Sequence, residues 1–467
     1  MSFTLTSFGA AGEVTGSKHL LKTPAGSQIL LDCGMFQGRR EISMEKNCCF
    51  GFEPKDIDAV LLSHAHIDHS GLLPKLGKDG FNGSIYTTEA TQGLSQYMLM
   101  DSAKIQQEDE SFIQRHQIKS PMERKVPLYG LEDVEKVMKQ FVGKPYMQTF
   151  KVTEDVTAEF LDAGHVFGSA VIVLQIQTDK GMKKLIFTGD LGRKNIPIIQ
   201  DPVMVGQADY LIIESTYGDR AHERVTEIEL DLKSIINKTA RRGGKIFIPA
   251  FALERTQEII LRLEGLIHDG EIPSLPIYVD SPLASRLTKV FEQHPDYYDE
   301  ETRARLKKDK KIFSFPNLKY TDSVEDSKQL NYLNGPCIII SASGMAENGR
   351  IRHHLKNNIE DEKNSVLFVG YQAEETLGRK LVEGNKVVSI FNQNYQVRAE
   401  IVFFKSLSAH ADENDLDGYV KYIKGLKKIF LVHGEEGSRQ AFARRIHAYY
   451  PAAEVILPQP AVDNDLE

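Results

Sequence analysis

The sequence predicts an α/β protein in which one domain is interrupted by a second, inserted α/β domain. The chain opens with short apolar runs separated by glycine-rich turns, which is typical of antiparallel strands. From about Asp209, continuous apolar runs alternate with helical patterns, which indicates a parallel sheet covered on both faces. Past Ala399 the opening pattern of short apolar runs separated by turns resumes. We therefore expect a first domain at 1–209, an insertion at 210–396 and the rest of the first domain at 397–467.

The composition is that of an ordinary globular protein. Of 467 residues, 41% are hydrophobic and 26% are charged, and this length suggests two or three domains. No apolar stretch reaches the roughly 20 residues needed to span a bilayer. The first six residues enter a strand-like alternation without the basic and apolar regions of a signal peptide. We expect a cytoplasmic protein without membrane contact.

Charge and cysteine content argue against two classes of site. A net charge of −8 disfavours a protein that coats nucleic acid electrostatically, although a local basic groove or bound cations can still hold phosphates. None of the four cysteines stands in a C-x-x-C pair, so neither a thiolate zinc site nor a disulfide framework is indicated.

Within the first domain, the apolar runs define the strands and a charged stretch defines the helices. Glycines 9, 12 and 16 do not form G-x-G-x-x-G before a helix, so we interpret them as turn residues and not as a nucleotide fingerprint. Residues 91–140 are charged and predict helices. Strands are expected at 3–8, 19–21, 28–31, 149–152, 157–161, 169–177 and 184–187.

The insertion shows helical patterns between short apolar runs. This alternation predicts βαβ units and hence a parallel sheet. The expected helices cover 226–241 and 255–267, and the expected strands cover 210–213, 245–249, 277–279 and 337–340. After the insertion, strands are expected at 400–404 and 428–432, with a helix between them.

The strongest chemical signal is the segment 63–69, Ser-His-Ala-His-Ile-Asp-His, which follows the apolar run 59–62. Imidazole nitrogen and carboxylate oxygen are the preferred non-thiolate ligands of zinc. A loop leaving a strand can direct alternate side chains at one or two ions. A histidine-rich surface turn is the alternative, and the density of donors in H-x-H-x-D-H argues against it.

Other donors follow other predicted strands, and loops at one edge of a sheet converge in space. Seven donors are too many for one tetrahedral zinc, but they suit two ions that share a carboxylate and leave a bridging water. This reasoning predicts a dinuclear hydrolase. The seven donors are His64, His66, Asp68, His69, His165, Asp190 and His433.

At these residues the sequence resembles the metallo-β-lactamase superfamily. Within it, the sequence is similar to the β-CASP nucleases, which include the pre-mRNA 3′-end cleavage-and-polyadenylation endonuclease and its bacterial and archaeal relatives. The matching residues, in order, are Asp32, His64 to His69, His165 and Asp190 for the superfamily, and Glu214, His410 and His433 for the β-CASP group. Also family-like are Pro249-Ala250-Phe251-Ala252, Asp280-Ser281-Pro282-Leu283, Ser341-Ala342-Ser343-Gly344-Met345 and Tyr371-Gln372-Ala373.

The resemblance implies an αββα sandwich of the metallo-β-lactamase type with an inserted β-CASP α/β domain, whose mostly parallel sheet is flanked by helices. It also implies two Zn²⁺ per chain, with Asp190 bridging them. One zinc would be held by His64, His66 and His165, and the second by Asp68, His69 and His433.

The resemblance further implies catalytic roles. Asp32 would orient ligands and the attacking hydroxide, and Asp68 counts among the catalytic residues as well as among the ligands. His410 would be the general acid that protonates the leaving ribose oxygen, with Glu214 hydrogen-bonded to it and raising its pKa. The alternatives are a carboxylate that caps a strand end for Asp32 and a structural histidine for His410.

The implied activity is hydrolysis of single-stranded RNA by a bridging hydroxide between two zinc ions, in RNA processing or decay. We expect an endonuclease. Whether the protein is also a 5′-to-3′ exonuclease, and whether it forms a homodimer, is left open. Substrate-binding residues would be Ser341, Ser343 and Gly344, whose loop leads into a helical pattern and can offer N–H groups to a phosphate, and Arg379. A plain turn with a serine cap and a solvated arginine are the alternatives.

Two acidic positions depart from the family pattern. Glu254 stands where relatives frequently have glycine, and the segment 374–375 is Glu-Glu where a second glycine is common. Both changes add negative charge near the expected phosphate path, and the sequence leaves open whether Glu254 and Glu375 weaken substrate binding.

Three other functions compete with this interpretation. A small-molecule hydrolase of the same superfamily, acting on thioesters or lactams, would share the ligands but would not need the insertion. An inactive RNA-binding paralogue would have lost ligands, whereas this chain keeps all seven. In the DNA-processing branch an apolar residue typically replaces the last histidine, so His433 favours RNA.

Overall fold

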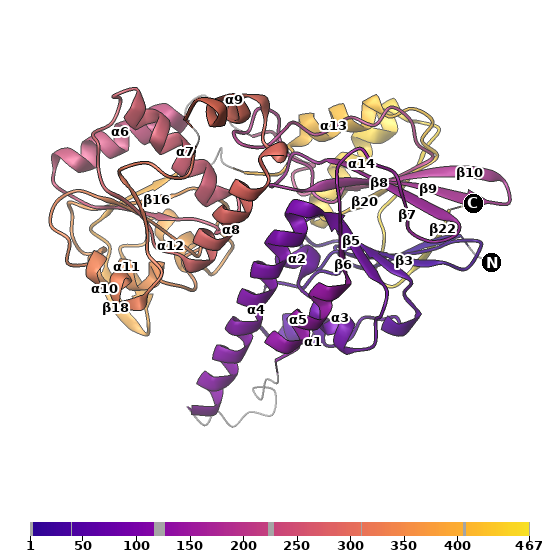
Figure 1. Ribbon diagram of the computed structural model, residues 1–467, viewed down its shortest axis with the longest axis horizontal. Coiled ribbons are helices and arrows are strands. Elements are labelled where there is room, and N and C mark those ends of the chain that lie inside the picture. Colours follow the sequence, from indigo (N-terminus) through magenta and orange to yellow (C-terminus); the bar gives the residue numbers. More distant parts are fainter. Residues whose placement is uncertain are drawn as a thin grey trace. The chain divides into compact units, whose positions relative to one another are not determined.

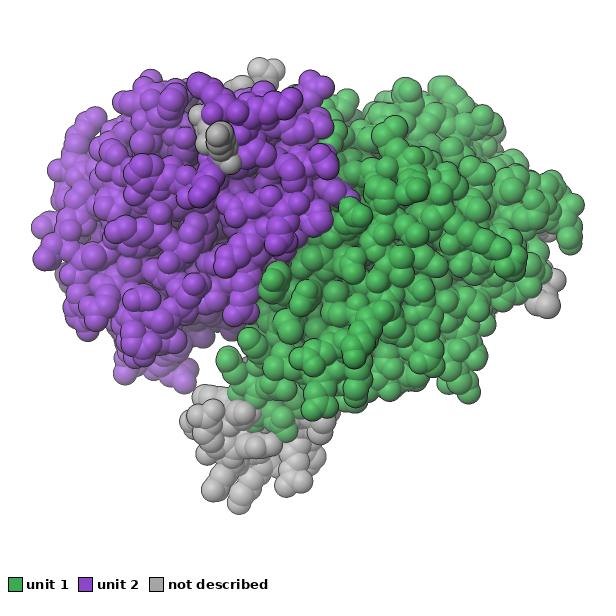
Figure 2. Space-filling view, in the orientation of Figure 1, with its two compact units in different colours: residues 1–221, 409–467 green, residues 222–408 purple. Residues whose placement is uncertain are grey.

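The computed structural model describes residues 3–38, 40–115, 127–222, 228–309, 311–404 and 408–466. The chain divides into two compact units, coloured separately in Figure 2. Unit 1 combines Met1–Ala221 with Ala409–Glu467, and unit 2 is His222–Ser408. Unit 2 is therefore the insertion expected from the sequence, with later boundaries.

The expected boundaries at 209/210 and 396/397 are wrong, and strand pairing explains why. Strand β11 (Tyr210–Glu214) pairs in parallel with β10 (Gly181–Phe187) and β20 (Lys428–Val432), all in unit 1. Strand β19 (Glu400–Phe403) pairs with β16 (Ser365–Phe368) in unit 2. A continuous apolar run indicates that a strand is covered on both faces, but it does not indicate which sheet the strand joins.

The first sheet of unit 1 is mixed. Its first three strands form the antiparallel meander predicted from the sequence, and pairing becomes parallel from β3 onward. The strand order is β22 (Asp463–Asp465), β1 (Thr4–Gly9), β2 (Lys18–Lys22), β3 (Gln28–Leu31), β4 (Ala59–Leu61), β5 (Ser84–Thr88) and β6 (Phe141–Lys144).

The second sheet of unit 1 joins strands from both ends of the chain. It is antiparallel from β7 to β10 and parallel from β10 to β21. Its order is β21 (Glu454–Ile456), β20, β11, β10, β9 (Ala170–Thr178), β8 (Val156–Asp162) and β7 (Phe150–Lys151).

The two sheets pack face to face between helices, so unit 1 is an αββα sandwich, as predicted (Figure 1). Alternation along the strands builds the layers. Ile29 and Leu31 face the second sheet, whereas Leu30 faces the helices. Likewise Ile212 faces the first sheet, whereas Leu211 faces the helices on the other side.

Helices from different parts of the chain cover the outer faces of the sandwich. The first sheet is covered by α3 (Leu73–Lys78), α4 (Glu89–Arg115) and α5 (Leu131–Val137), and the second by α13 (Glu413–Tyr422) and α14 (Glu436–Tyr449). Unit 1 also contains α1 (Arg40–Cys48) and α2 (Ile67–Ser70). The helical stretch expected at 91–140 thus contains α4 and α5, while its residues 116–126 lie outside the described residues.

Unit 2 is built on a six-stranded sheet in which every pairing is parallel, as the sequence predicted. The order is β14 (Leu318–Tyr320), β13 (Ile277–Val279), β15 (Ile338–Ser341), β12 (Ile246–Pro249), β16 and β19. A separate hairpin joins β17 (Val387–Ile390) to β18 (Gln393–Gln396).

Helices cover both faces of this sheet (Figure 1). The chain moves from β12 toward β14 and then returns through β15 toward β19, so right-handed crossovers place its helices on opposite faces. Residues of α10 (Val324–Leu330), α11 (Ile351–Asn358) and α12 (Leu377–Val382) share one apolar cluster. The earlier helices are α6 (Ile228–Arg241), α7 (Arg255–His268), α8 (Pro282–Gln293) and α9 (Glu300–Asp309).

The reversal of direction occurs between neighbouring strands β12 and β15. In open α/β sheets this point opens a crevice beyond the carboxyl ends of the strands, where ligands bind. Within the described residues, no helix combines the length and the apolar character required to cross a membrane.

Candidate metal centre

The histidine segment leaves β4 and folds into the short helix α2. His66 is the N-cap of that helix, and the backbone N–H of Ser70 donates to the His66 carbonyl at 2.8 Å. This single turn places Asp68 and His69 beside one another, while His64 and His66 precede it in the loop. One short segment therefore supplies two pairs of donors, His64 with His66 and Asp68 with His69.

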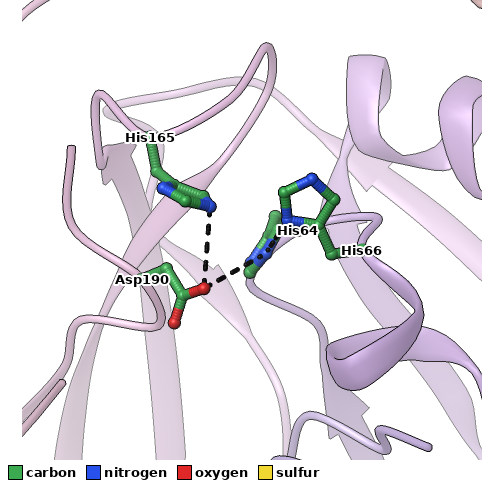
Figure 3. A group of neighbouring side chains, drawn as sticks. All are labelled: His64, His66, His165 and Asp190. Atoms are coloured by element: carbon green, nitrogen blue, oxygen red, sulfur yellow. Dashed lines mark hydrogen bonds and ion pairs between the residues drawn. The ribbon is translucent and has the colours of Figure 1, made fainter. Parts of the chain in front are cut away.

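His64, His66 and His165 gather with Asp190, as Figure 3 shows. Asp190 Oδ2 lies 3.7 Å from His64 Nε2 and 3.6 Å from His165 Nε2. His66 Nδ1 lies 3.0 Å from His64 Nε2. The four ligand atoms all lie within 4.8 Å of one another, which is a spacing that one metal ion can span.

Asp68, His69 and His433 form a second group on the other side of Asp190. His433 Nε2 lies 3.6 Å from Asp68 Oδ2 and 3.3 Å from His69 Nε2. Asp190 also reaches this group, because its Oδ2 lies 3.3 Å from His69 Nε2 and its Oδ1 lies 3.5 Å from His433 Nδ1. The structure thus brings together all seven donors predicted from the sequence, with Asp190 between the two groups.

Unsatisfied polar atoms in the cluster test whether these residues fit metal ions. Among the described residues, neither ring nitrogen of the buried His165 nor Oδ1 of Asp190 has a hydrogen-bond partner. Each such atom costs roughly 1–3 kcal/mol when it is left unpaired. Burial lowers the pKa of His64 and His165 well below the usual value, so both imidazoles are neutral and have a lone pair for a metal. The donor set therefore fits metal ions.

Asp32 lies behind these ligands and contacts one of them. It follows β3 with φ 60°, a left-handed conformation that aspartate tolerates better than most residues. Its Oδ2 accepts from His69 Nδ1 at 2.7 Å, and its Oδ1 accepts from the backbone N–H of Ser63 at 2.8 Å. A carboxylate on Nδ1 directs the Nε2 lone pair of His69 toward the metal position.

Two side chains that sequence reasoning missed hold other ligands in the same way. Thr216 Oγ1 lies 3.1 Å from His433 Nδ1, and Ser63 Oγ lies 3.1 Å from His64 Nδ1. Ser63 directly precedes the first ligand and Thr216 follows β11, so their positions at strand ends were the only available signal.

His410 and Glu214 form a pair beside Asp190. Glu214 is buried at the end of β11, and each of its carboxylate oxygens lies 3.1 Å from His410 Nδ1. Burial lowers the pKa of His410, but the charges of Glu214 and Asp190 outweigh it and raise that pKa to about 9. The His410 side chain remains 23% exposed. Asp412 caps α13 by accepting from the N–H groups of Asn414 and Asp415.

Comparison with known proteins agrees with this geometry. The chain matches the Metallo-beta-lactamase superfamily over residues 19–250, the Beta-Casp domain over 256–381 and the Zn-dependent metallo-hydrolase RNA specificity domain over 394–458. Ribonuclease TTHA0252 of Thermus thermophilus is 38% identical, and the alignment covers 92% of this chain and 92% of the relative. The chain belongs to the β-CASP family of the metallo-β-lactamase superfamily.

Two archaeal relatives support the same assignment. An RNase J-like protein of Methanocaldococcus jannaschii is 32% identical, and the alignment covers 92% of this chain and 94% of the relative. Transcription termination factor FttA of Cenarchaeum symbiosum is 30% identical, with 96% of this chain and 70% of the relative covered. Family membership and the donor cluster together make this β-CASP protein a metal-dependent hydrolase.

The substrate-binding residues predicted in unit 2 lie near the carboxyl ends of its strands. Ser341 is buried, and its hydroxyl donates to the Asp280 carbonyl at 2.8 Å, so it supports the loop from within. Ser343 Oγ accepts from the backbone N–H of Asn348 at 3.4 Å. Arg379, on α12, pairs with Glu383 at 2.6 Å and has no contact with the loop of Ser343 among the interactions of the described residues.

Phe251, in one of the family-like motifs, lies against this loop. A Cβ on Gly344 would meet the ring at 2.9 Å, and one on Gly370 would meet it at 3.4 Å. Gln372 Nε2 donates to the carbonyls of both glycines, at 3.0 and 2.9 Å. These bonds join the loops after β15 and β16, and the Phe251 ring, from the loop after β12, packs against both and remains 38% exposed.

Glu254 and Glu375 both have left-handed backbones, with φ 67° and 68°. Glycine is the residue that adopts this conformation without strain, so a glycine at either place would fit the backbone. Glu254 is buried, whereas Glu375 is exposed.

Proposed function

We propose that this protein is a zinc-dependent ribonuclease that hydrolyses phosphodiester bonds of single-stranded RNA. The observation that carries the proposal is the position of Asp190 between two groups of metal donors, with the His410–Glu214 pair beside it. RNA as the substrate is supported by the name of the domain matched at 394–458 and by the names of the ribonuclease and RNase J-like relatives.

Two zinc ions fit the seven donors, because nitrogen and carboxylate ligands without thiolate suit zinc. His64, His66 and His165 would hold one ion and Asp68, His69 and His433 the other, with Asp190 shared. When bound, the ions would supply an acidified water as nucleophile and would neutralise charge on the phosphate. Asp32, Thr216 and Ser63 fix the ring orientations on which this ligand set depends.

His410 acts as the general acid. Glu214 contacts Nδ1 and holds the ring in place, and Nε2 is the nitrogen that would donate a proton to the leaving ribose oxygen. The carboxylate favours the protonated ring, since it lies in a buried position and bonds directly to it. Protonation of the leaving oxygen avoids the expulsion of an alkoxide.

Unit 2 contributes substrate contacts at the crevice between β12 and β15. Backbone N–H groups of Gly344 and Met345 in the loop after β15 suit a phosphate, whereas that of Ser343 donates to the Asn348 carbonyl at 3.3 Å. The exposed ring of Phe251 offers an unpaired base a stacking surface. Arg379 contributes charge from α12. Action in RNA processing or decay, exonuclease action, a cytoplasmic location and a homodimer remain predictions.

One experiment tests both the metal and the reaction. Protein purified without chelator is analysed for metal, loaded with zinc, and incubated with end-labelled single-stranded RNA and its DNA equivalent. We expect about two zinc ions per chain and cleavage of RNA only, with His165→Ala as the inactive control. Absence of zinc uptake contradicts the metal centre. Zinc uptake with hydrolysis of thioesters or lactams, and not of RNA, contradicts the substrate.

A further inference from the structure

A chain of buried polar side chains continues beyond Asp32, away from the metal ligands. Ser17 Oγ lies 3.1 Å from Asp32 Oδ2 and 3.4 Å from His19 Nε2. His19 Nδ1 lies 2.9 Å from Ser7 Oγ. All four side chains are buried in unit 1: Ser7 and His19 lie on β1 and β2, Ser17 directly precedes β2, and Asp32 directly follows β3. The mechanism proposed above uses Asp32 but does not use the other three.

Counting hydrogens fixes the direction of every bond in this chain. A carboxylate only accepts, so Ser17 donates its single hydroxyl hydrogen to Asp32. The Ser17 oxygen is then free to accept, and the hydrogen it receives is on His19 Nε2. Burial lowers the pKa of His19 to about 3, so its ring is neutral and has one N–H.

The remaining nitrogen of His19 must accept, and Ser7 Oγ donates to it. All the bonds therefore run toward Asp32, from Ser7 through His19 and Ser17. Asp32 Oδ2 receives three donors in total, with His69 Nδ1 at 2.7 Å and Ser63 Oγ at 2.9 Å as the other two. Asp32 thus stays an acceptor, which keeps the hydrogen of His69 on Nδ1 and the lone pair on Nε2.

We propose that His19 is a positioning residue of the metal centre, which acts through Ser17 and Asp32 to hold His69 in the tautomer and orientation that bind the second metal ion. The proposal rests on the metal centre and not on the identity of the substrate. A neutral histidine suits this place because one ring can donate to Ser17 and accept from Ser7 at the same time.

The size of the effect follows from distance along the chain. A direct partner of a metal ligand typically changes metal affinity by roughly 10- to 100-fold. His19 acts two bonds farther away, so we expect roughly a threefold to tenfold loss when its donor is removed, scaled down from that range. The loss should fall on the ion held by His69 and not on the ion held by His64, His66 and His165.

The test compares two substitutions of His19 in the full chain. His19→Leu removes the donor and keeps an apolar group beside Phe187, whose ring centroid lies 5.6 Å from that of His19. His19→Gln keeps an amide donor near the Nε2 position. Zinc affinity is measured by competition with a chromophoric chelator, and the Tm of the metal-free protein is measured alongside. We expect His19→Leu to weaken one zinc and His19→Gln to restore most of it.

Phe187→Leu is the matched control, because it disturbs the same packing without touching the polar chain. We expect it to lower the Tm and leave zinc affinity unchanged. If His19→Leu and Phe187→Leu lower the Tm alike and both leave zinc affinity at the wild-type value, the inference is wrong. If the wild-type protein binds no zinc at all, the proposed function fails instead.

Ser17→Ala gives a second route if His19→Leu does not fold. It should weaken the same zinc, because it removes the hydrogen bond through which His19 acts on Asp32. A wild-type affinity for both zinc ions in Ser17→Ala would overturn the proposal.

Discussion

His410 Nδ1 lies 3.1 Å from each carboxylate oxygen of Glu214, although the two residues are far apart in the sequence. Glu214 also accepts from the backbone N–H of Leu191 at 2.7 Å, next to the ligand Asp190. The carboxylate therefore fixes the ring of His410 relative to the metal donors. This relationship separates the proposed acid from the ligands and makes the two roles testable apart.

Replacement of His410 by alanine should abolish proton donation and keep the metals. We expect cleavage to fall by roughly 100- to 10,000-fold, the usual contribution of a positioned acid, with zinc content and RNA affinity nearly intact. His433→Ala is the matched comparison, because removal of a ligand should also weaken the second zinc. Zinc analysis and single-turnover cleavage measure the two effects.

RNA with a bridging 3′-sulfur leaving group sharpens this prediction, since sulfur departs without a proton. We expect that substrate to rescue His410→Ala and not His433→Ala. Loss of zinc from His410→Ala, or absence of rescue, would show that His410 is not the acid.

Glu214→Gln should move the pH dependence of cleavage. Because Glu214 helps to raise the pKa of His410 to about 9, its removal lowers that pKa. A general acid works only while protonated, so activity falls as the pH rises through this pKa. The alkaline limb of the kcat/KM profile should shift to lower pH by roughly one to three units. An unshifted limb would contradict the pairing.

Phe251→Ala should weaken RNA binding without affecting the metals. A stacked base contributes about 1–3 kcal/mol, so Kd for single-stranded RNA should rise by roughly 5- to 150-fold. Tyr332→Ala is the control, because Tyr332 is 78% exposed and precedes β15, at the opposite edge of the same sheet. Equal Kd values for the two variants would exclude stacking on Phe251.

Asp280 should make unit 2 sensitive to acid. It is buried, and its carboxylate accepts from His354 at 2.6 Å, Ser327 at 2.6 Å and Arg350 at 2.7 Å. Burial alone would raise its pKa, but the hydrogen bonds from His354, Ser327 and Thr321 outweigh it and lower the pKa to about 2. A folded-state pKa below the unfolded value stabilises above about pH 4, and this stability is lost as the pH falls toward 2.

Ionised Asp280 contributes about 2 kcal/mol to the free energy of unfolding, because its pKa differs by nearly two units between the folded and unfolded states. Asp280→Asn should lose it at neutral pH and show a flatter pH dependence between about pH 4 and 2. Urea unfolding of the metal-free protein, followed by circular dichroism, gives the free energy at each pH. Asp296→Asn, at an exposed position, is the control. A wild-type protein equally stable at pH 2 and pH 5 would contradict this prediction.

Glu375→Gly should not destabilise the protein. A left-handed conformation costs a non-glycine residue roughly 1–2 kcal/mol, which offsets the entropy that glycine loses on folding. Glu374→Gly, one residue earlier and without a positive φ, should cost about 0.5–1 kcal/mol. Thermal unfolding of the two variants side by side measures the contrast, and a lower Tm for Glu375→Gly than for Glu374→Gly would contradict the strain.

Much of the architecture follows from local patterns. Alternation of apolar residues predicted the opening meander, and uninterrupted apolar runs between helices predicted the parallel sheet of unit 2. Both patterns report whether one or two faces of a strand are buried, and that property is encoded within the strand itself. The seven donors were found for a related reason, since each follows an apolar run and strand ends meet at one edge of a sheet.

Only the tertiary structure decided which strands are neighbours and which side chains complete the centre. The run at 210–213 belongs to unit 1 because β11 pairs with β10 and β20, a choice that no pattern within β11 encodes. The contacts of Thr216 with His433, and of His19 with Asp32 through Ser17, join residues whose types are common in any loop or strand. Such hydrogen bonds exist only once the sheets have closed, because their directions depend on burial and on the partners that packing supplies.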